Sequence, residues 1–354
     1  MLARTCSLIA LFALLSHVDV AGQPIPTTRP AEQTLTVTEP SINVEGATPE
    51  QAKALRQYMP ENRKFEVRLI EGKGQEHYRF LQANFISPLK TPWPENNLVP
   101  GEIYLPRKVA DGPVIGAVVL DIMDGSAFVA RSLARGLAQQ GVAAIYIPMA
   151  CYGARRPADR SHFAYFAEHP EKTPDNLRQT VMDIRRAKAI LAALPEVDDE
   201  RIAITGVSLG GIMTSLAAGV DGTFWRVVPI LAGGDIAAIC FHDTRETRRI
   251  RQACEAKGID QKRLAEILRP VEPLTFANRI DPKSCLMINA LHDEVIPMPT
   301  TIALRKAIGM PQMLMIPVGH YGAALFLPNI RQRTIDHIMG KKVTGLEFTP
   351  ADKH

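Results

Sequence analysis

The sequence predicts an α/β fold in which a mainly parallel sheet is covered by helices on both faces. Short apolar runs alternate with amphipathic helical patterns from about residue 65 to residue 340, the order expected of strands joined by helical crossovers. Some runs, such as Val114 to Leu120, are apolar throughout. A strand that is buried on both faces of a parallel sheet has this composition.

The expected strands follow one another along the chain. Phe65 to Ile70 and His77 to Ile86 are separated by Gly72 and Gly74, which indicate a turn. The later strands are expected at Leu98 to Leu105, Val114 to Leu120, Val142 to Ile147, Arg201 to Thr205, Arg226 to Leu231, Leu286 to Leu291 and Met313 to Pro317.

Helices are expected between these strands. One helical pattern runs from Phe128 to Gln140, and another is expected at Pro299 to Ile308. Thr173 and Pro174 supply an N-cap and a first helical residue for a third helix, which apolar residues at spacings of three and four extend to Leu194.

One interval is far longer than a single crossover helix needs. Between Leu231 and Leu286 the chain is helical in pattern and heavily charged, with Gly258 as a break. Full burial of so many charges is unfavourable. We therefore expect a small helical cap at residues 236–285, over the C-terminal edge of the sheet, where ligands bind in open α/β folds.

The two ends of the chain differ from the domain at residues 65–340. Residues 1–22 contain Arg4, an apolar run from Leu8 to Leu15 and small residues before Gln23. This order predicts a signal peptide and export to the periplasm or beyond the cell, and the run is too short to span a membrane. Residues 23–64 are rich in Pro, Thr, Gln and Glu, which predicts a disordered leader. Residues 341–354 are expected to form a C-terminal tail.

Composition excludes some partners. The chain is 46% hydrophobic and 22% charged, with a net charge of +4, and no basic block is interleaved with aromatics, so we expect no nucleic-acid partner. Once the signal peptide is removed, no stable membrane insertion is expected. Four cysteines then remain, whose spacing does not match a zinc site, and both disulfides and free thiols stay open. They are Cys151, Cys240, Cys254 and Cys285. Neither a metal nor an organic cofactor is implied, and the oligomeric state is not indicated.

The sharpest local motif surrounds Ser208. The sequence Gly-Val-Ser-Leu-Gly-Gly at residues 206–211 follows an expected strand and precedes a helical stretch from Ile212 to Ala218. This context is that of a nucleophile elbow, a strained turn that exposes the serine hydroxyl above the sheet. A serine hydroxyl is a weak nucleophile until a base takes its proton.

The partners of Ser208 are expected beyond the ends of later strands. Asp293 follows the strand that ends at Leu291, and His320 follows the strand that ends at Pro317. The order serine, acid, histidine is the one found with such elbows. Glu294 remains an alternative acid. His292 is a weaker candidate for the base, because it precedes the acid and lies on the wrong loop.

Residues from about 100 to 330 resemble the α/β-hydrolase superfamily. The stretch from Leu194 to Gly211 is similar to the branch that contains dienelactone hydrolases, acetyl xylan esterases and prolyl-oligopeptidase catalytic domains. The resemblance implies the α/β-hydrolase fold. Dienelactone hydrolases use a cysteine nucleophile, so Ser208 favours an ester or peptide hydrolase. The peptidases usually carry an N-terminal propeller, for which this chain has too few residues, and this favours an esterase.

The same chemistry requires donors for an oxyanion. One is expected to be the backbone N–H of Leu209. The other is expected from the loop that begins at Asp121, where many members of the superfamily have a His-Gly pair. Met123 is our choice for the second donor.

The loop from Met149 to Pro157 lies at the same expected edge, and similar segments occur in some esterase-like proteins. Arg155 or Arg156 could contact a substrate carboxylate or sugar. The interpretation that we favour is an ion pair that fixes the loop, with Asp159 as a candidate partner.

These inferences lead to one main hypothesis and two alternatives. The main hypothesis is an exported serine hydrolase that cleaves carboxylic esters, acetylated sugars or other small esters among them, through an acyl-enzyme on Ser208. Its partner is then a small-molecule or carbohydrate ester. One alternative is a peptidase or amidase that uses the same three residues, Ser208, Asp293 and His320. The other is a catalytically idle binding protein.

Overall fold

The structure is a computed structural model that describes residues 31–107, 112–123, 125–158 and 169–345. The expected signal peptide at residues 1–22 lies outside these ranges, as do residues 23–30 and most of the expected C-terminal tail. None of the helices within the described ranges combines the length and the hydrophobicity that a membrane crossing requires.

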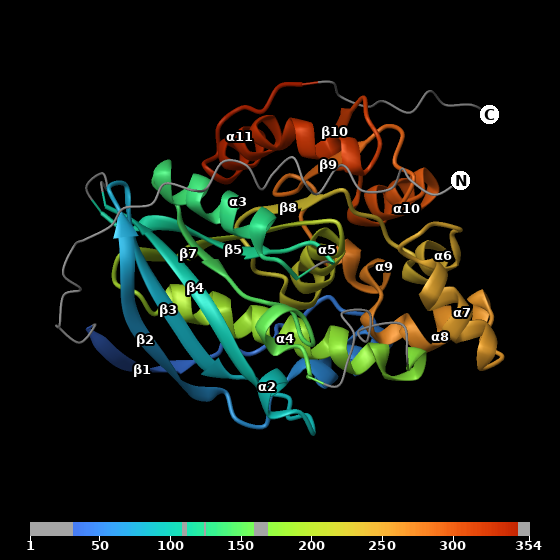
Figure 1. The fold of residues 1–354 in the computed structure, drawn as a ribbon, viewed down its shortest axis with the longest axis horizontal. Coiled ribbons are helices and arrows are strands. Elements are labelled where there is room, and N and C mark those ends of the chain that lie inside the picture. Colours follow the sequence, from blue (N-terminus) through green and yellow to red (C-terminus); the bar gives the residue numbers. More distant parts are fainter. Residues whose placement is uncertain (1–30, 108–111, 124, 159–168, 346–354) are drawn as a thin grey trace, which may run out of the picture. The chain divides into compact units, whose positions relative to one another are not determined.

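Ten strands form one sheet in the described part of the chain, in the order β1-β2-β3-β4-β6-β5-β7-β8-β9-β10 (Figure 1). The strands are β1 (Glu32–Thr38), β2 (Lys64–Gln75), β3 (Tyr78–Ile86), β4 (Leu98–Pro106), β5 (Val114–Leu120), β6 (Ala143–Tyr146), β7 (Val197–Val207), β8 (Val227–Ile230), β9 (Leu286–Ala290) and β10 (Gln312–Ile316). Strands β5 to β10 pair in parallel with one another, whereas β1 to β4 pair antiparallel and β4 also pairs antiparallel with β6. The predicted fold class is confirmed.

Helices cover both faces of this sheet (Figure 1). The helices of the described ranges are α1 (Pro49–Leu55), α2 (Pro94–Asn97), α3 (Phe128–Gln139), α4 (Thr173–Ala192), α5 (Leu209–Asp221), α6 (Ile236–Phe241), α7 (Arg248–Ala256), α8 (Gln261–Leu268), α9 (Pro273–Phe276), α10 (Met298–Ile308) and α11 (Leu327–Ile338). Helices α3 and α11 pack in the apolar core on one face, and α4, α5 and α10 pack in the core on the other.

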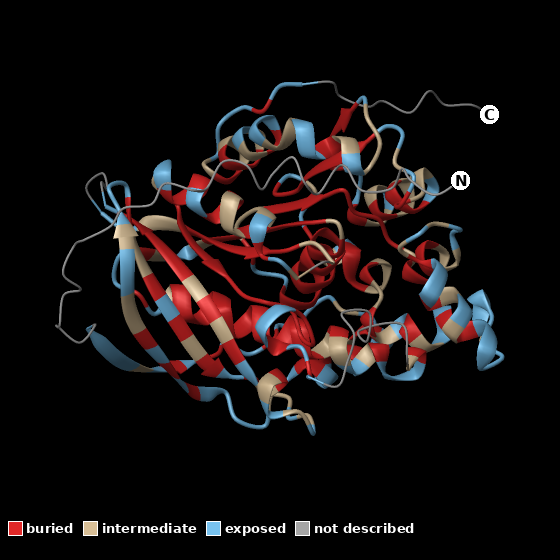
Figure 2. Cartoon of the chain, in the orientation of Figure 1, coloured by how far each residue is buried: buried red, intermediate tan, exposed pale blue. Residues whose placement is uncertain are grey.

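Burial along the strands reflects these two layers (Figure 2). All five residues of β9 and all four of β8 are buried, because helices lie on both sides of them. The first half of β2 alternates exposed and buried residues instead, as expected where one face of an antiparallel strand is left to solvent. The register pairs Leu120 of β5 with Gly206 of β7, and Val207 with Ile230 of β8. The C-terminal ends of three strands therefore meet at one edge.

The prediction of a disordered leader at residues 23–64 was wrong for the described part, which begins at residue 31. Strand β1 pairs with β2 from Glu32 opposite Ile70 to Thr38 opposite Lys64. Leu35 and Val37 alternate with threonines at the period of a strand, a signal that the polar composition conceals. The folded domain thus includes β1.

Tertiary contacts also hold the segment that follows β1. The hydroxyl of buried Tyr58 donates to the carbonyl of Pro270 at 2.8 Å, and the Gln51 amide donates to the carbonyl of Thr275 at 2.7 Å. Buried Glu39 forms ion pairs with Arg185 and Arg186 of α4. A buried carboxylate is stable only when it is paired or hydrogen-bonded, so these contacts require the segment to be folded.

The start of α4 differs from the prediction in detail. Thr173 is the first residue of the helix and not its N-cap, because a 3₁₀ turn at Pro170–Lys172 precedes it. Helix boundaries of this kind depend on contacts of the preceding chain, which the local sequence does not contain.

The expected cap at residues 236–285 divides into two parts. The apolar side chains from Leu264 onward pack into the core: Phe276 is fully buried, and its backbone lies against Gly219 of α5. The loop after α6 and the outer face of α7 are exposed and charged. Only this outer part stays a candidate for the predicted cap. We define the cap segment as residues 242–263.

The four cysteines of the described domain are buried free thiols. Burial raises the pKa of Cys240 and of Cys285 well above the usual range, and it raises the pKa of Cys254 to about 11. Because the thiolate is the reactive form, these side chains act as small core residues. The structure shows no disulfide among these four cysteines.

Candidate active site

Ser208 lies at a sharp turn between β7 and α5. Its backbone has φ 56° and ψ −118°, a conformation that residues with a side chain rarely adopt and that stores strain. Its N–H donates to the carbonyl of Ile230 at 2.9 Å, which ties the turn to β8. The backbone at Ser208 therefore has the geometry expected of a nucleophile elbow.

Two glycines make this turn sterically possible. A Cβ on Gly206 would lie 2.5 Å from the carbonyl oxygen of Gly210, and a Cβ on Gly210 would lie 2.5 Å from the carbonyl oxygen of Asp121. Real Cβ atoms do not come so close to backbone oxygens, so both positions require glycine.

His320 lies within hydrogen-bond distance of Ser208. It follows β10, and its Nε2 is 3.0 Å from the Ser208 Oγ. Its Nδ1 is 3.0 Å and 2.9 Å from the two carboxylate oxygens of Asp293. A hydrogen on Nδ1 that is held by the carboxylate leaves the Nε2 lone pair free to accept the serine proton.

Asp293 is held from behind by its own loop. Its Oδ1 accepts hydrogen bonds from the N–H groups of Val295 at 2.9 Å and Ile296 at 2.7 Å. The side chains of Asp293 and His320 are only 4% and 10% exposed. Because they are shielded from water, the interaction between carboxylate and imidazole is stronger than it would be at the surface.

Glu294 has a different position from Asp293. Its Oε2 accepts the backbone N–H of His320 at 2.8 Å and lies directly against Gly319. Glu294 therefore holds the histidine loop, whereas Asp293 contacts the imidazole ring. His292 is exposed, and its backbone N–H donates to the carbonyl of Val318, so it takes no part in this cluster.

The two expected oxyanion donors lie on neighbouring elements. Leu209 is the first residue of α5, and N–H groups at a helix N-terminus favour negative charge. Met123 lies on the loop after β5 and is partly buried against the core. Their catalytic role stays a prediction.

Arg155 is a structural residue. Its guanidinium is fully buried, lies 2.8 Å from the Asp183 carboxylate and donates to the carbonyls of Asn96 and Pro148. The favoured interpretation of an ion pair that fixes the loop is therefore correct, with Asp183 of α4 as the partner. The candidate partner Asp159 lies outside the described residues. Arg156 is exposed.

Sequence reasoning missed a contact between the cap segment and the histidine loop. The hydroxyl of Tyr321 donates to the Glu246 carboxylate, and the Tyr321 ring packs edge-on against the His320 ring at 5.8 Å between centroids. Partial burial and this carboxylate raise the pKa of Tyr321, so the phenol stays protonated and donates. The sequence signal for this contact was the position of Tyr321 directly after His320.

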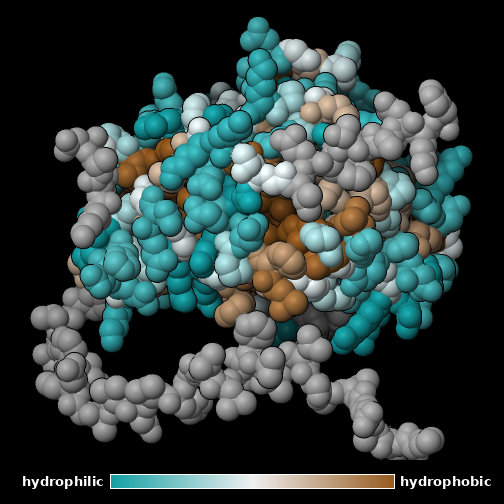
Figure 3. Space-filling view, turned by 90° about the horizontal axis from the view of Figure 1, so that it is seen from above, coloured by the Kyte–Doolittle hydropathy of each residue, from teal (hydrophilic) through white to brown (hydrophobic). Residues whose placement is uncertain are grey.

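Large exposed apolar side chains follow the strand ends at the catalytic edge. Phe128 begins α3 after the loop that follows β5, Leu291 comes directly after β9, and Leu325 lies in the 3₁₀ turn after His320. Figure 3 shows an apolar area within a largely hydrophilic surface on one face of the molecule.

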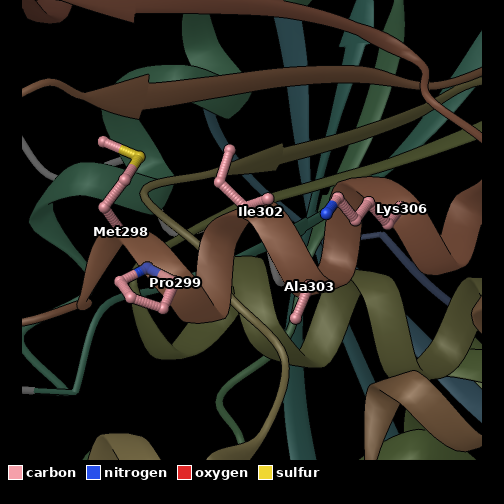
Figure 4. A pocket seen from close by; sticks show the side chains of 5 residues that line it. All are labelled: Met298, Pro299, Ile302, Ala303 and Lys306. Carbon is pink, nitrogen blue, oxygen red and sulfur yellow. The ribbon is translucent and has the colours of Figure 1, made fainter. Parts of the chain in front are cut away.

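A groove of about 530 Å³ lies along α10 and is not part of this site. Met298, Pro299, Ile302, Ala303 and Lys306 line it, all from one helix (Figure 4). None of Ser208, Asp293 and His320 contributes to its wall. The groove also has no convergent polar groups of the kind that orient a substrate.

The fold and the elbow together define the class as an α/β hydrolase. The sequence profile of the family described as alpha/beta hydrolase domain containing 18 matches residues 50–250. This range is more than half of the chain, so the chain belongs to that family. The match includes Ser208 and ends before Asp293 and His320. No curated protein sequence matches the chain.

Solved structures of the same fold resemble the chain over most of its length. An acetyl xylan esterase from Paenibacillus sp. R4 matches with a TM-score of 0.62 at 18% identity, covering 83% of this chain and 97% of that one. Acetyl xylan esterase 1 from Thermoanaerobacterium sp. JW/SL YS485 has a TM-score of 0.61 at 16% identity and covers 83% and 96%. An acylaminoacyl peptidase from Pyrococcus horikoshii has a TM-score of 0.52 at 16% identity and covers 80% and 49%. At these identities the likeness concerns the fold.

Proposed function

We propose that this protein is an exported serine hydrolase that cleaves small carboxylic esters, acetylated sugars among them, through an acyl-enzyme on Ser208. The observation that carries the proposal is the continuous hydrogen-bonded chain from Ser208 Oγ through the His320 ring to Asp293. Export is proposed from the sequence of residues 1–22.

The geometry supports a two-step acyl transfer. The Ser208 Oγ attacks the ester carbonyl carbon while His320 Nε2 takes its proton, and the carbonyl oxygen becomes an oxyanion. The tetrahedral intermediate collapses, the alcohol leaves with the proton from His320, and the acyl group stays on Ser208. Water then attacks the acyl-enzyme with His320 again as base, which releases the carboxylic acid and restores Ser208.

The coverage of the structural neighbours supports an ester rather than a peptide substrate. The two acetyl xylan esterases align over almost their whole length, whereas the acylaminoacyl peptidase aligns over about half of its own. The exposed apolar side chains at the catalytic edge suit a small acyl group or an ester's alcohol.

A panel of substrates tests this proposal. The purified mature protein is expected to hydrolyse 4-nitrophenyl acetate with a kcat/KM at least about tenfold above that for peptide nitroanilides, because ester cleavage needs less leaving-group activation. Acetylated xylose and acetylated xylan are assayed alongside by acetate release. Faster cleavage of the anilides would favour a peptidase. Absence of turnover on every substrate would favour a binding protein.

The cap segment is proposed to restrict the size of the substrate. It reaches the residue after His320 through the contact between Glu246 and Tyr321. A lid held in this way shapes the pocket without joining the chemistry. Replacing the whole segment would remove buried Ile250 and Cys254, so single substitutions at the contact are the sharper experiment.

Tyr321→Phe and Glu246→Ala are each expected to raise kcat/KM for butyryl and hexanoyl esters relative to acetyl esters by about fivefold. The reason is that loss of a partly exposed hydrogen bond of about 1 kcal/mol releases the cap segment. The ratio is measured with 4-nitrophenyl esters of increasing chain length. Glu255→Ala is the matched control, since it removes a carboxylate on α7 that pairs with Arg251 and not with the histidine loop. An unchanged ratio in both test variants would contradict the restriction.

A further inference from the structure

Asp121 is a buried carboxylate that joins both parts of the expected oxyanion site. It follows the last residue of β5 and is 2% exposed. Its Oδ2 accepts the N–H of Ala127 at 2.6 Å and its Oδ1 accepts the N–H of Ala130 at 3.2 Å. These bonds and the N-terminus of α3 offset the cost of burying the charge.

The hydrogen bonds of Asp121 close the loop that contains Met123. The loop begins after Leu120 of β5 and contains Met123. It ends where the N–H of Ala127 donates to the Asp121 carboxylate. Ala127 has φ 63°, a left-handed conformation that costs free energy for alanine. A hydrogen bond to its own N–H is a direct way to hold that conformation. The loop geometry therefore depends on the Asp121 side chain.

The backbone of Asp121 is fixed against the nucleophile elbow. Its carbonyl oxygen lies so close to Gly210 that a Cβ there would be 2.5 Å away. Leu120, the preceding residue, pairs with Gly206 in the sheet. Asp121 thus has a defined position relative to Ser208 and Leu209 on one side, while its carboxylate sets the Met123 loop on the other.

A second contact supports the middle of the loop. A Cβ on Gly125, which has φ +70°, would lie 2.9 Å from the backbone nitrogen of Gly153. The loop is therefore packed backbone against backbone on the segment that Arg155 anchors. Asp121 fixes its two ends, and Gly153 restricts its centre.

We propose that Asp121 is a positioning residue that sets the spacing between the two oxyanion donors, the N–H groups of Leu209 and Met123. The inference rests on the proposed hydrolase function and assigns to that site a residue that does not touch the substrate. A simple cap of α3 would account for the hydrogen bonds alone. It would predict a loss of stability without a specific loss of transition-state binding.

Asp121→Ala and Asp121→Asn separate these two roles. With active sites titrated, Asp121→Ala is expected to lower kcat for 4-nitrophenyl acetate by about 10- to 100-fold with KM changed less than about twofold, because an oxyanion donor acts in the transition state. Asp121→Asn is expected to lose less, since its one carbonyl oxygen can still accept an N–H. The inhibition constant of a trifluoromethyl ketone, which forms a tetrahedral adduct, is expected to rise by the factor by which kcat/KM falls.

The rate of fluorophosphonate labelling distinguishes failure of this inference from failure of the proposed function. Labelling uses the oxyanion site without any ester substrate, so it is expected to slow in both Asp121 variants even if the natural substrate is not an ester. Asp281→Ala is the matched control, because the Asp281 carboxylate accepts the backbone N–H of Lys283 at 2.9 Å in the turn before β9, at the opposite end of the strand from Asp293. It is expected to change thermal stability alone. Labelling and kcat within twofold of wild type for Asp121→Ala, or an Asp121→Asn protein that cannot fold, would assign Asp121 to stability and overturn the inference.

Discussion

Replacing Ser208 with alanine is expected to abolish covalent labelling by a fluorophosphonate and to lower kcat for ester hydrolysis by about 10⁴- to 10⁶-fold. The size of the effect follows from the role of the hydroxyl: without it no acyl-enzyme forms, and only transition-state binding by the rest of the site remains. Intact-mass analysis after labelling and steady-state kinetics measure the two effects.

The control for this substitution is Ser284→Ala. Ser284 is buried and donates to the carbonyl of Asp281 just before β9, at the strand's opposite end from Asp293. It is expected to label and turn over as the wild type does. Equal labelling of wild type and Ser208→Ala would remove Ser208 from the mechanism.

Asp293→Asn is expected to lower kcat by about 10⁴-fold while the fold is retained. The N–H groups of Val295 and Ile296 hold the oxygen at the Oδ1 position, so the new amide nitrogen would take the place of Oδ2, 2.9 Å from His320 Nδ1. An amide that donates to Nδ1 favours the tautomer with its hydrogen on Nε2. That tautomer cannot accept the serine proton. The pH-rate profile and kcat are the measurements.

Glu294→Gln is the matched comparison, one residue further along. The glutamine carbonyl can still accept the N–H of His320, as Glu294 Oε2 does, so we expect a loss of about tenfold or less. If Glu294→Gln proved damaging and Asp293→Asn mild, the assignment of the acid would be exchanged. Equal and small effects would show that neither carboxylate orients the ring.

Local patterns in the sequence were sufficient for the central part of the fold. Val114 to Leu120 coincides with β5, and the expected helix from Phe128 differs from α3 by one residue. The reason is that buried parallel strands and amphipathic helices have periodic compositions that depend little on distant residues. The elbow motif and the order of Ser208, Asp293 and His320 could also be recognised from the sequence, because each of these residues follows a recognisable strand.

The remaining features depended on residues distant in sequence. The polar segment at residues 31–64 is folded because Glu39 pairs with Arg185 and Tyr58 donates to the carbonyl of Pro270, and neither partner can be inferred from the segment itself. Helices after Leu264 joined the core for the same reason.

By itself, the sequence determined the class of fold and the three residues that meet at its edge. Only the tertiary structure distinguished the contacts of Asp293 from those of Glu294, which are adjacent and chemically alike, because the turn of their loop directs one carboxylate to the His320 ring and the other to its backbone. It also showed how Asp121 and Tyr321 contact the elements of the site. Hydrogen bonds between loops depend on where the strands place those loops, and that placement is a property of the whole packed sheet.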